Sequence, residues 1–214
     1  MSVWLDAVLI LIVLLGLLII VSHRLGSMIQ IFGLQSCILG VVPFFLYANG
    51  IEFFIIIVAL AAIVLRGFLM PSFLYWAIRH VDMRTEINPT IGIGTTLLLS
   101  GLAIVGSFLL ASKLVFPMKI ASDMVIPCSF SLIIMGFLLV IGRMKAISQV
   151  VGYLVLENGI FLFAMLLLKK MPLLVEMGIL LDLFIAAVVL GIVVNNISDE
   201  FNNTDTVQLT TLKD

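Results

Sequence analysis

Long, nearly unbroken apolar stretches alternate with short polar segments along the whole chain. A window of about 20 residues, the length of α-helix that crosses a hydrocarbon core of about 30 Å, detects seven candidate membrane spans. They cover residues 3–22, 27–48, 51–78, 91–111, 121–141, 146–168 and 173–195. What remains is short loops and a polar tail from Ser198. The pattern predicts an all-α integral membrane protein of about seven transmembrane helices, without a soluble domain.

The composition supports a membrane protein and excludes several other classes. Of the 214 residues, 63% are hydrophobic and only 11% are charged. The formal net charge is -1 and no Lys/Arg-rich block is present, which argues against nucleic-acid binding. Cys37 and Cys128 lie in apolar runs, with no CxxC motif or Cys/His cluster. We therefore expect no zinc, iron–sulfur cluster or other cofactor in this chain.

Loop charges predict the orientation in the membrane. With seven spans, the two chain ends lie on opposite sides. Placing the N-terminus outside leaves six basic loop residues in the cytoplasm and four outside, the distribution favoured by the positive-inside rule. The cytoplasmic set is Arg24, Arg79, Arg84, Arg143, Lys145 and Lys213, and the outer set is Lys113, Lys119, Lys169 and Lys170.

Two segments of the chain resemble each other. RLGSMIQIFGLQSCILG, from Arg24, aligns with RMKAISQVVGYLVLENG, from Arg143, and four positions are identical. The matched pairs are Arg24 and Arg143, Gln30 and Gln149, Gly33 and Gly152, and Gly40 and Gly159. We interpret the chain as two three-helix units in parallel orientation, residues 1–81 and 121–197, joined by a spacer helix within 82–120 and followed by a polar cytoplasmic tail, 198–214.

One acidic residue stands near the centre of the sixth predicted span. Glu157 is followed by Asn158 and Gly159, whereas the first copy of the repeat has Ile38 at the matching position. A carboxylate at that depth costs a few kcal/mol and usually faces protein or water. Glu157 therefore predicts a site on an ion pathway, and the alternative is a packing or hydrogen-bonding role.

The seventh predicted span holds two more acids. Glu176 lies near its outer end, and Asp182 lies six residues further on, a rise of about 9 Å. If the last two helices are adjacent, Asp182 and Glu157 share a similar depth and can face one cleft. Gly159 and Gly178 would allow close helix approach and leave space for water. Glu176 has an alternative interpretation as an interfacial residue that pairs with a neighbouring lysine.

The third predicted span contains a cation. Its 28 residues reach about 42 Å, more than the membrane core, so it must tilt, bend or continue along the surface. Arg66 and Gly67 lie in its middle and Pro71 follows, which favours a kink or an interfacial extension that ends at Tyr75 and Trp76. Arg66 either extends to the nearer interface or lies buried beside a polar path, where it favours ionised carboxylates.

These motifs together resemble a known family. GYLVLENGIFL, LVEMGILLD and TDTVQLTTLK, with the basic residue Arg66 before a proline and the segment Ala77–His80, are similar to component E of hydrogenase-4. That subunit belongs to the membrane part of group 4 nickel–iron hydrogenase and formate hydrogenlyase complexes.

The last three spans also resemble the small K subunit of respiratory NADH dehydrogenase. In that subunit the first membrane glutamate falls where Leu154 stands here, and Glu157 lies three residues later, nearly one helical turn away. Gln35 occupies the equivalent position in the first repeat and cannot titrate, which argues against a second proton path there.

The resemblance implies a non-catalytic subunit of the cell inner (cytoplasmic) membrane. Antiporter-like and other membrane-arm subunits would surround it, and a peripheral hydrogenase module would carry the nickel–iron centre and iron–sulfur clusters. Glu157 and Asp182 would be protonatable relay sites, Glu176 an outer relay, and Arg66 a tuning charge, with Asn158, Gly159, Gly178 and Gln35 in support. The alternatives are a structural scaffold, or a subunit of a cation/proton antiporter or an NADH dehydrogenase-like complex.

Overall fold

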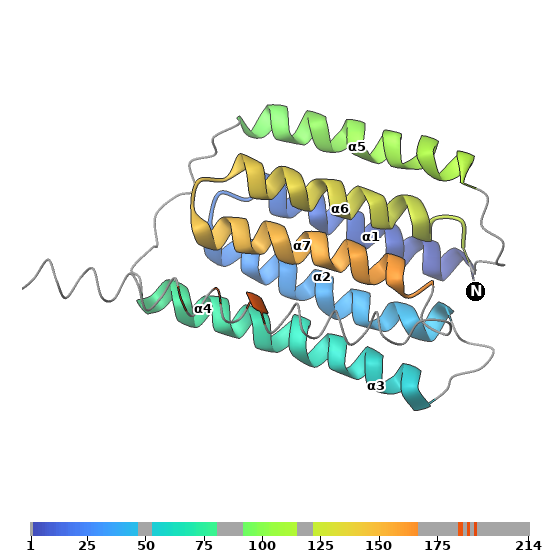
Figure 1. Cartoon of the computed structure of the whole chain (residues 1–214), viewed down its shortest axis with the longest axis horizontal. Coiled ribbons are helices and arrows are strands. Elements are labelled where there is room, and N and C mark those ends of the chain that lie inside the picture. The colour runs from blue at the N-terminus through green and yellow to red at the C-terminus, as the bar shows by residue number, and fades with distance from the viewer. Residues whose placement is uncertain are drawn as a thin grey trace, which may run out of the picture.

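The described part of the chain is entirely helical. A computed structural model describes residues 2–46, 53–80, 92–114 and 122–166, together with Phe184, Ile185, Val188 and Gly191, and these ranges contain no β-strand. The elements are α1 (Ser2–Val21), α2 (Leu25–Leu46), α3 (Phe53–Ala62), the π-helix η1 (Ile63–Leu69), α4 (Met70–His80), α5 (Ile93–Lys113), α6 (Val125–Gly142) and α7 (Ala146–Ala164) (Figure 1).

Five of these helices, α1, α2, α5, α6 and α7, are long and apolar enough to cross a membrane. The third predicted span is one continuous helical run from α3 through η1 to α4. The seventh predicted span, 173–195, falls almost entirely outside the described residues, so the count of seven and the division into two units stay predictions. The described helices confirm a helical membrane protein.

The helices form a bundle with α1, α2, α6 and α7 at its centre. Short turns at residues 22–24 and 143–145 join α1 to α2 and α6 to α7 as antiparallel neighbours. Across the bundle, α2 packs against α7 and α1 packs against α6. Figure 1 shows α5 on the α6 side of this core and the run from α3 to α4 on the α2 side. The third predicted span therefore packs against α2, and the side chain of its Arg66 extends to α7.

Glycines bring α6 and α7 unusually close. A Cβ atom placed on Gly159 would lie 2.8 Å from the backbone nitrogen of Ile133, and one on Gly152 would lie 2.8 Å from that of Val140. Helix backbones in membranes approach this closely only where small residues line the interface. The α6–α7 pair is therefore a rigid support for whatever side chains α7 presents on its other faces.

The helix around Arg66, where a kink or an interfacial extension was expected, is a π-helix. Ala59 and Ile78 are both buried on the third helical run. Over the 19 residue steps between them, a regular α-helix turns about 100° beyond a whole number of turns. The wider turn of η1 removes this excess and keeps the buried side of the run facing the bundle. Pro71, which has no N–H to donate, follows directly after η1 and the Met70 cap.

The buried guanidinium of Arg143 connects the turn at residues 143–145 to the end of α1 and the turn at residues 22–24. Arg143, which is 4% exposed, donates from Nη2 to the carbonyls of Ile20, at 2.6 Å, and Ser22, at 3.3 Å, at the end of α1. A cation is favourable there because these carbonyls carry the negative end of the helix dipole. Burial lowers the pKa of Arg143 from its ordinary value. The matched residue of the repeat, Arg24, is exposed.

Candidate functional site

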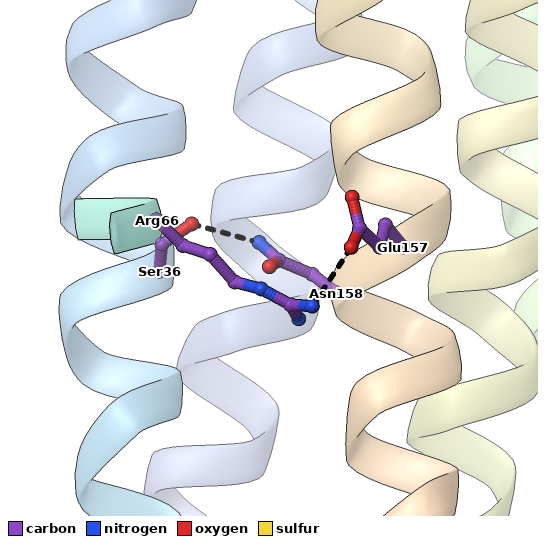
Figure 2. Close-up of polar contacts among 4 residues, drawn as sticks. All are labelled: Ser36, Arg66, Glu157 and Asn158. Carbon is purple, nitrogen blue, oxygen red and sulfur yellow. Dashed lines mark hydrogen bonds and ion pairs between the residues drawn. The ribbon is translucent and has the colours of Figure 1, made fainter. Parts of the chain in front are cut away.

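An ion pair lies in the centre of the bundle between η1 and α7. Arg66 Nη2 lies 2.8 Å from Glu157 Oε1, and the side chains are only 5% and 3% exposed (Figure 2). Arg66 therefore turns into the protein instead of toward the membrane surface. Removing two charges from water is expensive, and their close contact offsets this cost by keeping the pair neutral overall.

The same face of α7 offers Arg66 a second contact. The guanidinium carbon of Arg66 lies 4.4 Å from the centroid of the Phe161 ring, a cation–π geometry. Phe161 follows Glu157 by four residues, so both side chains stand on one side of the helix. The carboxylate and the aromatic ring thus hold the guanidinium against α7.

A chain of neutral polar groups continues from α7 into α2 and α1. Asn158 Nδ2 donates to Ser36 Oγ at 2.9 Å and to Gln35 Oε1 at 3.4 Å, and Gln35 Nε2 donates to the Ile12 carbonyl at 2.9 Å. Figure 2 shows the Asn158 amide turned toward Ser36, with the Glu157 carboxylate on the opposite side of the view, where it meets the Arg66 guanidinium. All of these polar side chains are buried.

The orientation of both amides follows from this chain. A backbone carbonyl only accepts hydrogen bonds, so Gln35 must turn its nitrogen to Ile12 and its oxygen to Asn158. Asn158 must then present its nitrogen to Gln35. The Oδ1 atom of Asn158 consequently points away from α2. That oxygen is buried and has no hydrogen-bond donor among the described residues. The amides are therefore fixed in direction, and neither can carry a charge.

Gly16 on α1 makes room for Gln35. A Cβ atom there would lie 3.4 Å from Gln35 Nε2 and 3.2 Å from the Sδ of Met135. A larger side chain would push the amide away from the Ile12 carbonyl. The polar chain thus depends on a small residue one helical turn from the carbonyl that ends it.

The structure brings four of the predicted site residues together: Arg66 and Glu157 as a pair, and Asn158 and Gln35 as the hydrogen-bonded chain beside it. Gly159 lies next to them but faces α6, where Ile133 and Ser129 occupy the space that we assigned to water. The remaining predicted site residues, Glu176, Gly178 and Asp182, lie outside the described residues.

Two site residues were not predicted from the sequence. Phe161 stands four residues after Glu157, so helical spacing alone could have indicated it. Ser36 is adjacent to Gln35, but its contact with Asn158 depends on the packing of α2 against α7. The described ranges hold no group of three or more His, Cys, Asp or Glu residues arranged for a metal ion.

The chain is distantly similar to known proteins over most of its length. It is 26% identical over 203 residues to an uncharacterized protein of Mycobacterium tuberculosis, which covers 94% of this chain and 92% of that protein. It is 24% identical over 153 residues to hydrogenase-4 component E of Escherichia coli, covering 72% of this chain and 71% of the relative, and the Shigella flexneri protein matches equally. No family model matches the chain. No solved structure matches it either.

Proposed function

We propose that this protein is a membrane subunit of a hydrogenase-like complex and that its buried polar site forms part of a proton pathway. The buried Arg66–Glu157 pair is the observation that carries the proposal, because charged residues inside membrane helices usually serve transport. The distant likeness to hydrogenase-4 component E and the five membrane-length helices support the membrane-subunit part.

Proton uptake at this site follows a defined exchange of contacts. A proton binds the Glu157 carboxylate, an O–H bond forms, and the hydrogen bond from Arg66 Nη2 to Oε1 breaks. Arg66 stays protonated throughout, so the neutral site becomes positive, and its field favours onward release of a proton. Arg66 stands on a π-helix, an element found mostly at functional sites, where a shift of the turn moves the guanidinium relative to α7.

The hydrogen-bonded side chains of Gln35, Ser36 and Asn158 orient this site, and they neither take up nor release a proton. We assign the next relay position to Asp182 and the outer one to Glu176, with Gly178 at the helix contact between them. The proposal retains seven spans in two parallel three-helix units at 1–81 and 121–197, a C-terminal half like the K subunit, and an inner-membrane location with the N-terminus outside.

Redox chemistry in this proposal belongs to partner chains. A peripheral hydrogenase module would hold the nickel–iron centre and iron–sulfur clusters, and antiporter-like subunits would extend the proton path through the membrane. Redox changes in those partners would move Arg66 or hydrate the path, which alters the proton affinity of Glu157.

The decisive experiment measures proton pumping and redox turnover together in liposomes that contain the purified complex. Glu157→Gln keeps the shape of the side chain and removes its ability to ionise, so pumping should fall at least tenfold while the complex stays assembled. Asp6→Asn, an acid-to-amide change on α1 where Ser122 donates to the carboxylate, is the matched control and should pump normally.

A scaffold subunit predicts the opposite result. The pair also ties η1 to α7, so a purely structural role has a physical basis. In that case Glu157→Gln leaves pumping and turnover intact, and truncation after Ser198 disrupts assembly. Copurified nickel and iron would separate both proposals from a simple cation/proton antiporter, whose activity would instead require sodium or potassium.

A further inference from the structure

A groove opens along the side of α7 that also carries Glu157, in the half of the helix that begins at Ala146. Its volume is about 240 Å³. Val140 of α6 forms one wall, Ala146, Val150 and Tyr153 of α7 form the floor, and Phe184 and Val188 form the other wall. Ile185, beside them, belongs to the hydrophobic core. The groove is therefore bounded by three segments of the chain.

The groove begins at a membrane surface and runs into the hydrocarbon. Ala146 is the first residue of α7 and follows the turn at residues 143–145. Tyr153 lies seven residues further along, about 10 Å deeper at 1.5 Å per residue. Because α6 and α7 are both of membrane-spanning length, the groove covers roughly the third of a core about 30 Å thick that lies next to this surface.

The lining suits an alkyl chain. The described residues that line it are aliphatic or aromatic except for Gln149, and among them Tyr153 adds a hydroxyl group. The Gln149 amide already donates to the Arg143 carbonyl at 2.8 Å. A transmembrane helix, about 10 Å wide with its side chains, is too broad for a space of 240 Å³. A single acyl chain is narrow enough to lie along it.

A basic residue adjoins the end of the groove at Ala146. Lys145, the N-cap of α7, stands directly before Ala146. The first backbone N–H groups of α7 add the positive end of a helix dipole at the same place. Basic residues at such a level between membrane helices attract anionic headgroups. Charge and shape thus point to one kind of occupant.

We propose that this groove binds one anionic glycerophospholipid, with an acyl chain along Ala146, Val150 and Tyr153 and the phosphate at Lys145. The bound chain ends one helical turn from Glu157, since Tyr153 precedes Glu157 by four residues. The site does not depend on a hydrogenase role, because it rests on the groove and the charge at its Ala146 end.

The test uses the full-length chain, with any partners that copurify, in nanodiscs that contain phosphatidylglycerol or phosphatidylcholine. A phosphatidylglycerol probe with a photoreactive group in its acyl chain should label the peptide that spans residues 146–153. Native mass spectrometry then measures the affinity for each lipid. Lys145→Gln should weaken phosphatidylglycerol binding about fivefold and leave phosphatidylcholine binding unchanged.

Ala146→Phe fills the groove and should reduce labelling of the 146–153 peptide at least fivefold. Leu98→Phe, on the exposed face of α5, is the matched control and should label like the wild type. Equal affinity for both lipids in the wild type, or equal labelling of α5 and α7, would overturn the proposal. A copurified quinone or a cross-linked partner segment at residues 146–153 would also overturn it.

Discussion

The helices α2 and α7 are matched in the repeat and pack against each other, yet they carry different chemistry. At their contact α2 offers Gln35 and Ser36, which are neutral, while α7 offers Glu157 and Asn158. The charge of Glu157 is balanced from η1 by Arg66 and not from α2. One copy of the repeat thus orients the site, and the other copy holds its charge.

The matched glycines of the two copies also pack against different helices. Gly33 and Gly40 of α2 face the third helical run, since their Cβ positions meet Pro71 and Ile63. Gly152 and Gly159 of α7 face α6 instead. Identical residues at matched positions therefore serve different neighbours, and likeness in sequence does not transfer the contacts of one copy to the other.

The largest effect is expected from separating the two charges. Arg66→Met leaves Glu157 buried without its cation and should lower the free energy of unfolding by about 3–5 kcal/mol. Thermal or detergent-induced unfolding of the purified protein measures this. Adding Glu157→Gln should restore most of the loss, and Arg79→Met, at an exposed position on α4, should change little. Equal losses in the single and double variants would contradict a coupled pair.

The next largest effect on stability is expected when the matched arginines of the repeat are compared. Arg143→Ala removes two hydrogen bonds to α1 carbonyls from a buried cation, so unfolding should become easier by about 1.5–3 kcal/mol. Arg24→Ala, at the exposed matched position, should cost less than about 0.5 kcal/mol. If both variants behave alike in the unfolding assay, the tie between the two turns contributes nothing to stability.

Helix contact distance gives a third contrast. Gly159→Ala places a methyl group against the backbone of α6 and should cost about 1–3 kcal/mol, because the two helices must separate. Gly101→Ala on α5, where nothing lies within 4 Å, should be close to neutral. Unfolding midpoints of the two variants measure the difference, and a neutral Gly159→Ala would mean that α6 and α7 are not tightly packed.

The neutral chain should give the smallest effect. Gln35→Leu removes the bond to the Ile12 carbonyl and one acceptor of Asn158, for an expected loss of about 1–2 kcal/mol. Thr95→Val, a polar-to-apolar change at an exposed position on α5, serves as the control and should stay within about 0.5 kcal/mol. A loss as large as that of Arg66→Met would assign Gln35 a greater role than orientation.

The sequence by itself determined the helical membrane class and most helix positions. The predicted spans 27–48 and 146–168 correspond to α2, Leu25–Leu46, and α7, Ala146–Ala164. These boundaries are predictable because the bilayer requires runs of about 20 apolar residues, a property of local composition. The depth of Glu157 followed from the same local rule.

Only the tertiary structure decided what Glu157 meets. Arg66 and Glu157 are 91 positions apart, and Asn158 and Ser36 are 122 apart. Such pairs depend on which helices become neighbours. In a membrane, side-chain packing between distant segments determines those neighbours, and the hydrophobic pattern of the sequence does not predict them. The π-helix that turns Arg66 toward α7 likewise arises from keeping one long helix packed against the bundle, so the ion pair is a product of the fold and not of any single span.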